Sequence, residues 1–160
     1  MQNEDFMREA LAEARIAYDM GEVPVGAVIV RSGEIVGRGH NTTETAKDPT
    51  CHAEMNAIRS AAKNLGGWRL PGCSMYVTVE PCSMCSGTIV LARIEELFIG
   101  TPDPKAGACV SLYSIVNDQR LNHRVATHVG LLQEECSSLM KDFFRARRKK
   151  NKPEKPEEEQ

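Results

Sequence analysis

Several features are absent from this sequence of 160 residues, and each absence narrows its function. No apolar run is long enough to cross a bilayer, so the sequence predicts no membrane contact. The first residues lack the basic and apolar regions of a signal peptide, and we therefore expect a cytoplasmic protein. There is no internal repeat and no sign of a second domain. We expect one folded domain over residues 1–150 and a charged, disordered tail over residues 151–160.

The chain has 20 Lys and Arg residues and 22 Asp and Glu residues, so neither sign of charge is in large excess. The net charge of −2 is unusual for a protein that binds nucleic acid. The cations are unevenly placed, however, since six of the eight residues from 145 to 152 are Lys or Arg. The cluster predicts a local basic surface, and the alternative is a solvated helix end favoured by the helix dipole.

A second closely spaced cysteine pair is missing as well. The chain has six cysteines, which should not form a disulfide framework in a reducing compartment. Only Cys82 and Cys85 show Cys-x-x-Cys spacing, and a closed structural zinc site usually needs two such pairs. The single pair therefore favours an open metal site, with a redox pair as the alternative. The remaining cysteines are expected to be free thiols with packing roles: Cys51, Cys73, Cys109 and Cys136.

What the chain does contain is a His-x-Glu motif, followed about thirty residues later by Pro-Cys-x-x-Cys. His52, Cys82 and Cys85 offer three zinc ligands, and a catalytic zinc site takes three and leaves the fourth position to water. Zinc lowers the pKa of such a water from about 15.7 to roughly 7. Glu54 would accept its proton as a general base and deliver it as a general acid. This pattern is the known signature of zinc-dependent nucleobase deaminases.

The local sequence places these ligands at two helix starts. Residues 74–79 are rich in strand formers, and Pro81 suits the first turn of a new helix. Cys82 and Cys85 are three positions apart and would share one helix face, where the helix N-terminus favours thiolates. His52 opens a second helical run. We therefore expect two helix starts to converge on one zinc ion.

Alternating helices and strands predict the α/β class, as a three-layer α/β/α fold with a central mixed five-stranded sheet. Residues 41–44 and 101–108 are expected to be loops, and loops that follow strand ends commonly carry binding groups. Helices are expected over 2–20, 53–63, 82–93 and 131–150, and strands over 23–30, 34–40, 74–79, 95–100 and 126–129. The inner face of the last helix would use Leu131, Leu132, Cys136, Leu139, Met140 and Phe143.

Over about residues 4–148 the chain resembles the bacterial tRNA-specific adenosine deaminases of the cytidine deaminase superfamily. The zinc motifs alone would equally fit deaminases of cytidine, deoxycytidylate, guanine or the riboflavin pathway. Three further motifs, at residues 103–108, 122–124 and 142–148, carry the resemblance to tRNA enzymes. The resemblance implies a cytidine-deaminase-like fold. It also implies hydrolytic deamination to inosine of the wobble adenosine in the anticodon of an arginine tRNA. It also implies one zinc ion per subunit and a homodimer in which both subunits shape the surface for the anticodon stem-loop.

The same resemblance assigns substrate contacts. Asn41 would hydrogen-bond the adenine. The alternative is that Asn41 is a turn residue whose side chain stabilises its own backbone. Val25, Ala53 and Val79 would line the base pocket. The anticodon loop would be contacted by Asp103, Lys105, Asn122 and His123, and the flanking nucleotides by Phe144, Arg145 and Arg148. Two departures from the family pattern are Cys51, where a small residue is common, and the charged tail.

Two other functions stay open on the residues alone. The first is deamination of a free base or nucleoside, such as guanine or cytidine. Comparing the ammonia released from tRNA with that released from free bases would distinguish it from the tRNA activity. The second is a zinc-binding RNA adaptor without catalysis, which any turnover would exclude.

Overall fold

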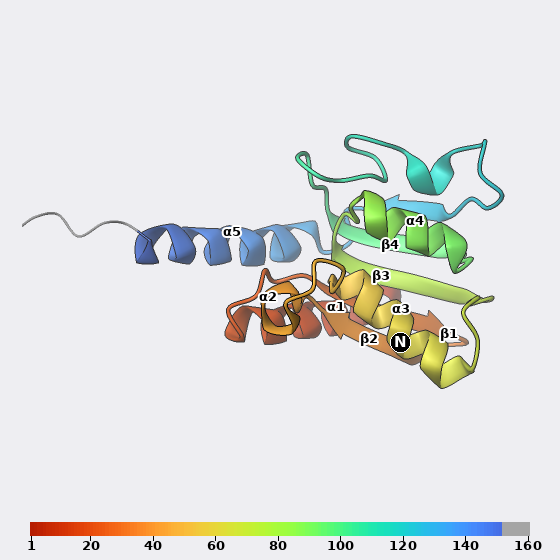
Figure 1. Ribbon diagram of the computed structural model, residues 1–160, viewed down its shortest axis with the longest axis horizontal. Helices are drawn as coiled ribbons and strands as arrows, with labels where there is room; N and C mark the ends of the chain where they lie inside the picture. The colour runs from red at the N-terminus through yellow and green to blue at the C-terminus, as the bar shows by residue number, and fades with distance from the viewer. Residues whose placement is uncertain (152–160) are drawn as a thin grey trace, which may run out of the picture.

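A five-stranded mixed sheet lies at the centre of the computed structural model, which describes residues 1–151 (Figure 1). Its strand order is β2-β1-β3-β4-β5. Strand β1 pairs antiparallel with β2 and β3, whereas β3, β4 and β5 are parallel, so the sheet is mixed as expected. The strands are β1 (Gly26–Arg31), β2 (Glu34–His40), β3 (Cys73–Val79), β4 (Glu96–Thr101) and β5 (Ala126–Val129).

Helices cover both faces of the sheet (Figure 1). Strand β1 shows why, because alternate residues of a strand point to opposite faces. Ala27 and Ile29 belong to the core beneath α3 and α4, whereas Val28 and Val30 belong to the core beneath α1 and α5. The three-layer α/β/α fold is therefore confirmed. The helices are α1 (Asn3–Asp19), α2 (Thr43–Ala46), α3 (Ala53–Leu65), α4 (Ser83–Leu91) and α5 (Gln133–Lys150), with a 3-10 turn at Ile115–Asn117.

Close backbone contact between β2 and α3 fixes the start of α3. A Cβ atom at Gly39 would lie 2.4 Å from the carbonyl oxygen of Ala53 and 2.4 Å from the backbone nitrogen of Ala57. Only glycine allows this approach. Since Ala53 begins α3, Gly39 sets how closely the His-x-Glu motif lies against the sheet.

One short helix replaces an expected loop. Residues 43–46 form α2, and the buried carboxylate of Glu22 explains it. This carboxylate accepts hydrogen bonds from the backbone N–H groups of Thr45 at 2.8 Å and Glu44 at 3.3 Å. An acceptor at a helix start satisfies donors that have no partner within the helix. Because Glu22 is supplied from elsewhere in the chain, local sequence did not indicate the helix.

Several element boundaries also differ from the expectation by one to three residues, and three of these differences have a clear physical reason. Strand β1 begins at Gly26 rather than at residue 23, since Pro24 has no N–H for a ladder and Val25 turns back onto Val23 with an N–O distance of 2.8 Å. Pro81 lies before α4 and not in its first turn, because Cys82 is the N-cap. Helix α5 begins at Gln133, after Leu132 in a left-handed conformation (φ 52°).

Helix α5 runs from the body of the fold into solvent (Figure 1). Its first half packs on the sheet through Cys136, and further along Phe143 packs against Tyr18 of α1. Both Cys136 and Phe143 are buried as predicted. Met140, expected in the core, lines a pocket instead. The expected tail falls, from residue 152 on, outside the described residues. Within residues 1–151, no helix combines the length and apolarity that crossing a bilayer requires.

Candidate active site

The three candidate metal ligands lie together beside the carboxyl end of β3. His52 and Cys82 are the N-cap residues of α3 and α4, and Cys85 lies in the first turn of α4. Nδ1 of His52 is 3.5 Å from Sγ of Cys82 and 3.6 Å from Sγ of Cys85. All three donor atoms lie within 4.8 Å of one another. The structure thus brings together the ligands that the sequence predicted.

These distances fit tetrahedral zinc. Zinc–sulfur bonds of about 2.3 Å and zinc–nitrogen bonds of about 2.0–2.1 Å place a nitrogen and a sulfur ligand about 3.6 Å apart. The two nitrogen–sulfur separations, 3.5 and 3.6 Å, match this value. Among the residues that the structure describes, no fourth Cys, His, Asp or Glu joins the cluster. Three protein ligands would leave one position for water, as in catalytic zinc sites.

At Cys82 the triad favours the thiolate, the form of cysteine that binds zinc. A hydrogen bond from the Cys85 thiol lowers the pKa of Cys82 to about 4. The same hydrogen bond, together with burial, raises the pKa of Cys85. The hydrogen bond with Cys82 also raises the pKa of His52. One proton therefore remains on the sulfur pair, and metal binding would release it.

Glu54 is the second residue of α3, and its side chain lines the same pocket as His52 and Cys82. The residue is 4% exposed, and this burial raises the pKa of its carboxyl to about 7. A carboxyl that titrates near neutral pH can both accept and release a proton. Its place beside the triad is therefore suited to proton transfer and not to ligation.

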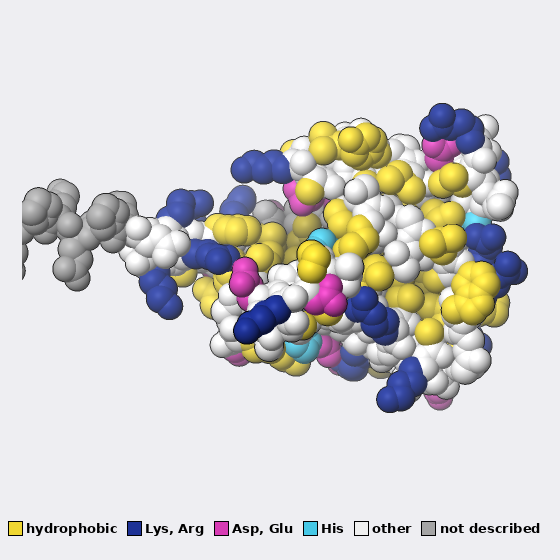
Figure 2. All heavy atoms as spheres, in the orientation of Figure 1, with side chains coloured by type: hydrophobic (Ala, Val, Ile, Leu, Met, Phe, Trp, Pro, Cys, Tyr) yellow, Lys and Arg dark blue, Asp and Glu magenta, His cyan; other side chains and the backbone are white. Residues whose placement is uncertain are grey.

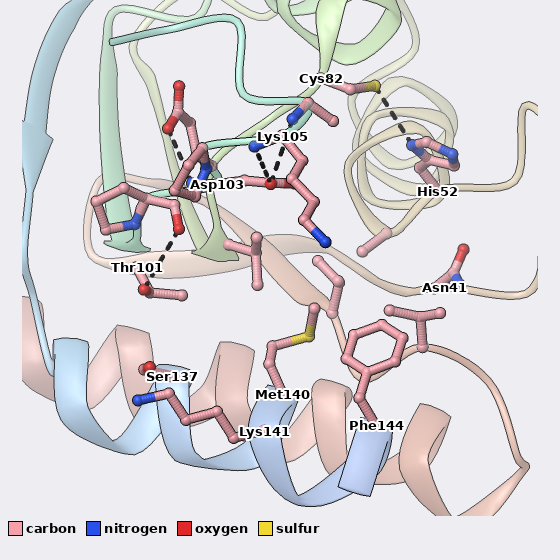
Figure 3. Close-up of a pocket in the computed structure, with 18 of the residues that line it drawn as sticks. Asn41, His52, Cys82, Thr101, Asp103, Lys105, Ser137, Met140, Lys141 and Phe144 are labelled. Carbon is pink, nitrogen blue, oxygen red and sulfur yellow. Dashed lines mark hydrogen bonds between the residues drawn. The ribbon is translucent and has the colours of Figure 1, made fainter. Parts of the chain in front are cut away.

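The cluster opens into a pocket of about 900 Å³, within the usual range for small-molecule sites. Figure 3 shows Met140 and Phe144 of α5 facing Lys105 and Asp103 of the loop after β4 across this pocket. The pocket lies at the carboxyl ends of β3 and β4, where open α/β sheets commonly bind ligands. Its lining includes most of the substrate residues that the sequence predicted: Val25, Asn41, Ala53, Val79, Asp103, Lys105, Phe144, Arg145 and Arg148.

Asn41 is the clearest polar group in the wall of the pocket. The residue is 7% exposed, and its backbone N–H donates to the carbonyl of Val25 at 3.1 Å. Its side-chain oxygen Oδ1 is buried without a hydrogen-bond partner among the described residues. A buried polar atom without a partner is costly, and such atoms mark places where a ligand completes the hydrogen bond. A turn role alone does not explain this side chain.

Asn122 and His123 do not reach the pocket of their own chain. They precede β5, and Nε2 of His123 lies 2.6 Å from the carbonyl oxygen of Ile94, just before β4. Because β4 and β5 are parallel, this loop lies at the amino ends of the strands. At about 3.3 Å per residue, the length of β4 separates it from the pocket by roughly 16 Å. Figure 1 shows this loop at the end of the sheet away from α5.

Glu80 is a buried residue to which the sequence assigned no role, although it directly precedes the Pro-Cys-x-x-Cys motif. The residue is 3% exposed. Burial would raise the pKa of its carboxyl, but hydrogen bonds from Ser111, Val110 and Asp103 outweigh it and hold the pKa below its usual value. The carboxylate therefore lies charged beneath the loop after β4.

The face of α5 that lines the pocket was only partly predicted from the sequence. Ser137, Met140 and Lys141 line the pocket together with Phe144 and Arg145 further along the helix. Positions three, four and seven apart lie on one face of a helix. The predicted residues Phe144, Arg145 and Arg148 therefore identified the face of α5 that lines the pocket. The remaining residues of this face lie three or four positions earlier in the sequence and follow from the helical period. Figure 2 shows the Lys and Arg side chains that surround α5.

Comparison with known proteins finds relatives that are named as deaminases. The cytidine and deoxycytidylate deaminase zinc-binding region matches residues 1–101. A tRNA-specific adenosine deaminase of Bacillus subtilis (strain 168) is 47% identical over 151 residues, covering 94% of this chain and 94% of its own. The relative of the same name from Aquifex aeolicus (strain VF5) is 48% identical over 145 residues, or 91% of this chain and 95% of its own.

Among solved structures, one from a study of A-to-I editing by tRNA:A34 deaminases at the wobble position of transfer RNA is similar, with a TM-score of 0.82 and 42% identity. The match covers 84% of this chain and 98% of that one. A guanine deaminase from Bacillus subtilis matches less well, with a TM-score of 0.61 and 30% identity over 98% of this chain and 99% of its own.

Proposed function

The chain belongs to the cytidine and deoxycytidylate deaminase family, and we propose that it deaminates the wobble adenosine of a tRNA anticodon to inosine. It is then a hydrolase that consumes water and releases ammonia. The observation that carries the proposal is the juxtaposition of the triad, Glu54 and the basic face of α5 in one pocket. Relatives at 47% and 42% identity bear names that describe this activity.

We propose one zinc ion per chain, held by His52, Cys82 and Cys85. Such an ion would activate a water molecule for attack on the amine-bearing ring carbon. Glu54 takes a proton from this water while the new carbon–oxygen bond forms, and it protonates the neighbouring ring nitrogen. Glu54 then takes the proton of the new hydroxyl group and transfers it to the departing amine. The carbon–oxygen double bond forms as the carbon–nitrogen bond breaks, and ammonia leaves.

The remaining pocket residues select and hold the base. Asn41 presents a buried amide oxygen that has no hydrogen-bond partner within residues 1–151, which supports a hydrogen bond to the extruded adenine. Val25 and Val79 would provide apolar walls for its faces. An enzyme that acts on a base must take it out of the stack, and the loop of an anticodon already holds its bases in single-stranded form.

The nucleotides beside the adenosine would lie along the pocket rim. Phe144, which is 38% exposed, is available to stack on a base, and Arg145 and Arg148 are available to phosphates. Asp103 and Lys105 on the opposite wall would contact the same RNA. By family resemblance, we propose an arginine tRNA as the substrate.

We further propose that two copies of the chain complete the site. Asn122 and His123 lie at the far end of the sheet, and a second copy would bring them to the RNA bound at this pocket. Exposed apolar side chains on α4 and the segment beside it offer a surface for that copy: Leu91, Val110, Leu112 and Tyr113. Figure 2 shows hydrophobic side chains gathered over the segment between β4 and β5.

The competing proposal is deamination of a free base, which the weaker similarity to a guanine deaminase keeps in view. A small free base would not need a cationic helix at the pocket rim. The 42% identity and higher TM-score of the tRNA-editing structure favour RNA.

Inosine formation in tRNA decides between them. The wild-type protein and Glu54→Ala are incubated with total tRNA, and inosine sites are read by sequencing, with guanine and cytidine in parallel. We expect inosine at the wobble position and a loss of about 10²–10⁴-fold in Glu54→Ala, typical for removal of an acid–base group. Faster ammonia release from guanine or cytidine than from tRNA would give the function to the competing proposal.

A further inference from the structure

A single buried carboxylate, that of Glu80, lies between the metal-binding helix and the substrate loop that follows β4. Glu80 comes two positions before Cys82, and its own N–H donates to the carbonyl of Thr101 at 2.9 Å, so its backbone joins the ends of β3 and β4. Its side chain turns beneath residues 103–111. The proposed mechanism gives this carboxylate no chemical task.

Backbone donors surround both of its oxygens. Oε2 accepts from the N–H groups of Cys109 at 3.1 Å, Val110 at 2.9 Å and Ser111 at 3.0 Å. Oε1 accepts from the N–H of Asp103 at 3.0 Å and from the hydroxyl of Ser111. Successive N–H groups aimed at one anion form a concave nest, here occupied by a side chain of the same protein.

The loop is shaped to fit this carboxylate. A Cβ atom at Gly107 would lie 2.3 Å from the carboxyl carbon of Glu80, so only glycine fits where the loop crosses it. Nearby, the carboxylate of Asp103 accepts from the N–H groups of Lys105 at 3.0 Å and Ala106 at 3.3 Å. Glu80 thus holds the N–H of Asp103, and Asp103 in turn holds the turn that presents Lys105.

We propose that Glu80 is a positioning residue for RNA binding, holding the loop of Asp103 and Lys105 against the metal-binding helix. This inference rests on the proposed tRNA function. The loop forms the wall opposite α5, so the spacing of the two walls depends on where Glu80 anchors it. A carboxyl group is suited to this role because its two oxygens together can accept several hydrogen bonds.

The near-isosteric variant Glu80→Gln is a selective test. Its amide has one oxygen and one NH₂ group, yet both positions face backbone donors. With the oxygen kept toward Cys109, Val110 and Ser111, the NH₂ group points at the N–H of Asp103. The variant should therefore retain most of the nest but release the Asp103 end of the loop.

Four measurements are made on the full-length zinc protein: zinc content, amide hydrogen exchange, the Kd for an anticodon stem-loop RNA, and kcat. We expect wild-type zinc content, amide exchange across residues 103–106 about tenfold faster, a Kd raised about tenfold and kcat within about threefold of wild type. Loss of binding without loss of turnover is the signature of a contact remote from the reacting atoms.

Glu13→Gln is the matched control, because Glu13 is also a buried glutamate but contacts His40 and Arg38 instead of this loop. It should leave the exchange of residues 103–106 and the RNA affinity unchanged. If Glu80→Gln does not fold, Ser111→Ala takes its place, since it removes one donor to Oε1, and the same changes are expected on a smaller scale.

Unchanged exchange at residues 103–106 in a folded variant overturns the inference, as does faster exchange with unchanged RNA affinity. A fall in kcat with unchanged Kd also overturns it, because Glu80 would then act on the chemistry. Hydrogen exchange and zinc content need no turnover. A wild-type protein that binds the RNA but forms no inosine would therefore contradict the proposed function and leave this test intact.

Discussion

Single residues define the chemistry of the site. The nitrogen of His52 and the sulfurs of Cys82 and Cys85 have the spacing of tetrahedral zinc ligands, although they come from two helices. Glu54 lies beside them as a buried carboxyl outside this cluster of candidate ligands. Substitution of a zinc ligand should change the zinc content of the protein, whereas substitution of a residue that contacts the base should change turnover and leave the zinc content as it is.

Cys82→Ser should lose most of its zinc. A serine hydroxyl is a harder and mostly protonated ligand, whereas zinc sites favour thiolate sulfur. Even changes to residues that only orient ligands cost about 10–100-fold in affinity, so losing a ligand should cost at least that much. Metal analysis of the purified variant against Cys51→Ser, a thiol outside the triad, measures it. Full zinc occupancy in Cys82→Ser would exclude this ligand set.

Asn41→Ala should lower kcat/KM for tRNA by about tenfold or more, the usual effect of one lost hydrogen bond in a buried site. Zinc content and the salt dependence of RNA binding should not change, because Asn41 would contact a base and not a phosphate. The variant should also fold normally, since Oδ1 has no protein partner to lose among the described residues. Wild-type turnover, or a changed salt dependence, would contradict the base-reading role.

At the scale of elements, α5 has two functions on two faces. Cys136 and Phe143 pack inward, whereas Met140 and Phe144 lie on the face that lines the pocket. The packed part fixes the direction of the helix, and the cationic part beyond it extends into solvent (Figure 1). A helix fixed at one end in this way can present charges to a nucleic acid without unfolding the core.

The double variant Arg145→Ala/Arg148→Ala should weaken tRNA binding and make it less sensitive to salt. Each phosphate contact on a single strand contributes a slope of roughly −0.7 in log K against log salt, so two contacts should change the slope by about 1.4. Lys149→Ala/Lys150→Ala removes the same charge from the same helix outside the pocket lining. It should change the slope by clearly less. Equal effects would mean that the helix acts only through its total charge.

At the scale of the whole molecule, the parallel pairing of β4 and β5 keeps one predicted contact loop away from its own pocket. The segment with Asn122 and His123 lies at the amino ends of the strands, whereas Asp103 and Lys105 follow the carboxyl end of β4. The two predicted contact loops therefore lie at opposite ends of the sheet within one chain. This arrangement is the reason for the proposal that a second copy brings Asn122 and His123 to the RNA.

Leu112→Glu/Tyr113→Glu should convert the proposed dimer to a monomer and reduce tRNA turnover, because two charges would be buried at the contact. Light scattering at micromolar concentration measures the mass. Trp68→Glu is the control, since Trp68 is 65% exposed on the connection after α3. A wild-type protein that is active as a monomer would contradict the dimer.

Much of this protein could be predicted from short stretches of its sequence. Strands, helices and the His-x-Glu and Pro-Cys-x-x-Cys motifs depend on periodicity and on neighbours a few positions away, so the metal triad and the three layers were found without coordinates. The parallel pairing of β3 with β4 was not among the predictions, although a parallel pair joined by a helix is the usual connection in α/β folds.

Only the tertiary structure decided where distant residues meet. Glu22 caps α2 and Glu80 holds the loop at residues 103–111, and neither carboxylate has a local pattern that announces its partners. Met140 looked like a core residue by periodicity, yet it lies on the side of α5 that faces the pocket and the loop after β4. These contacts depend on strand register and helix direction, which are set by the packing of the whole chain and not by any one segment of it.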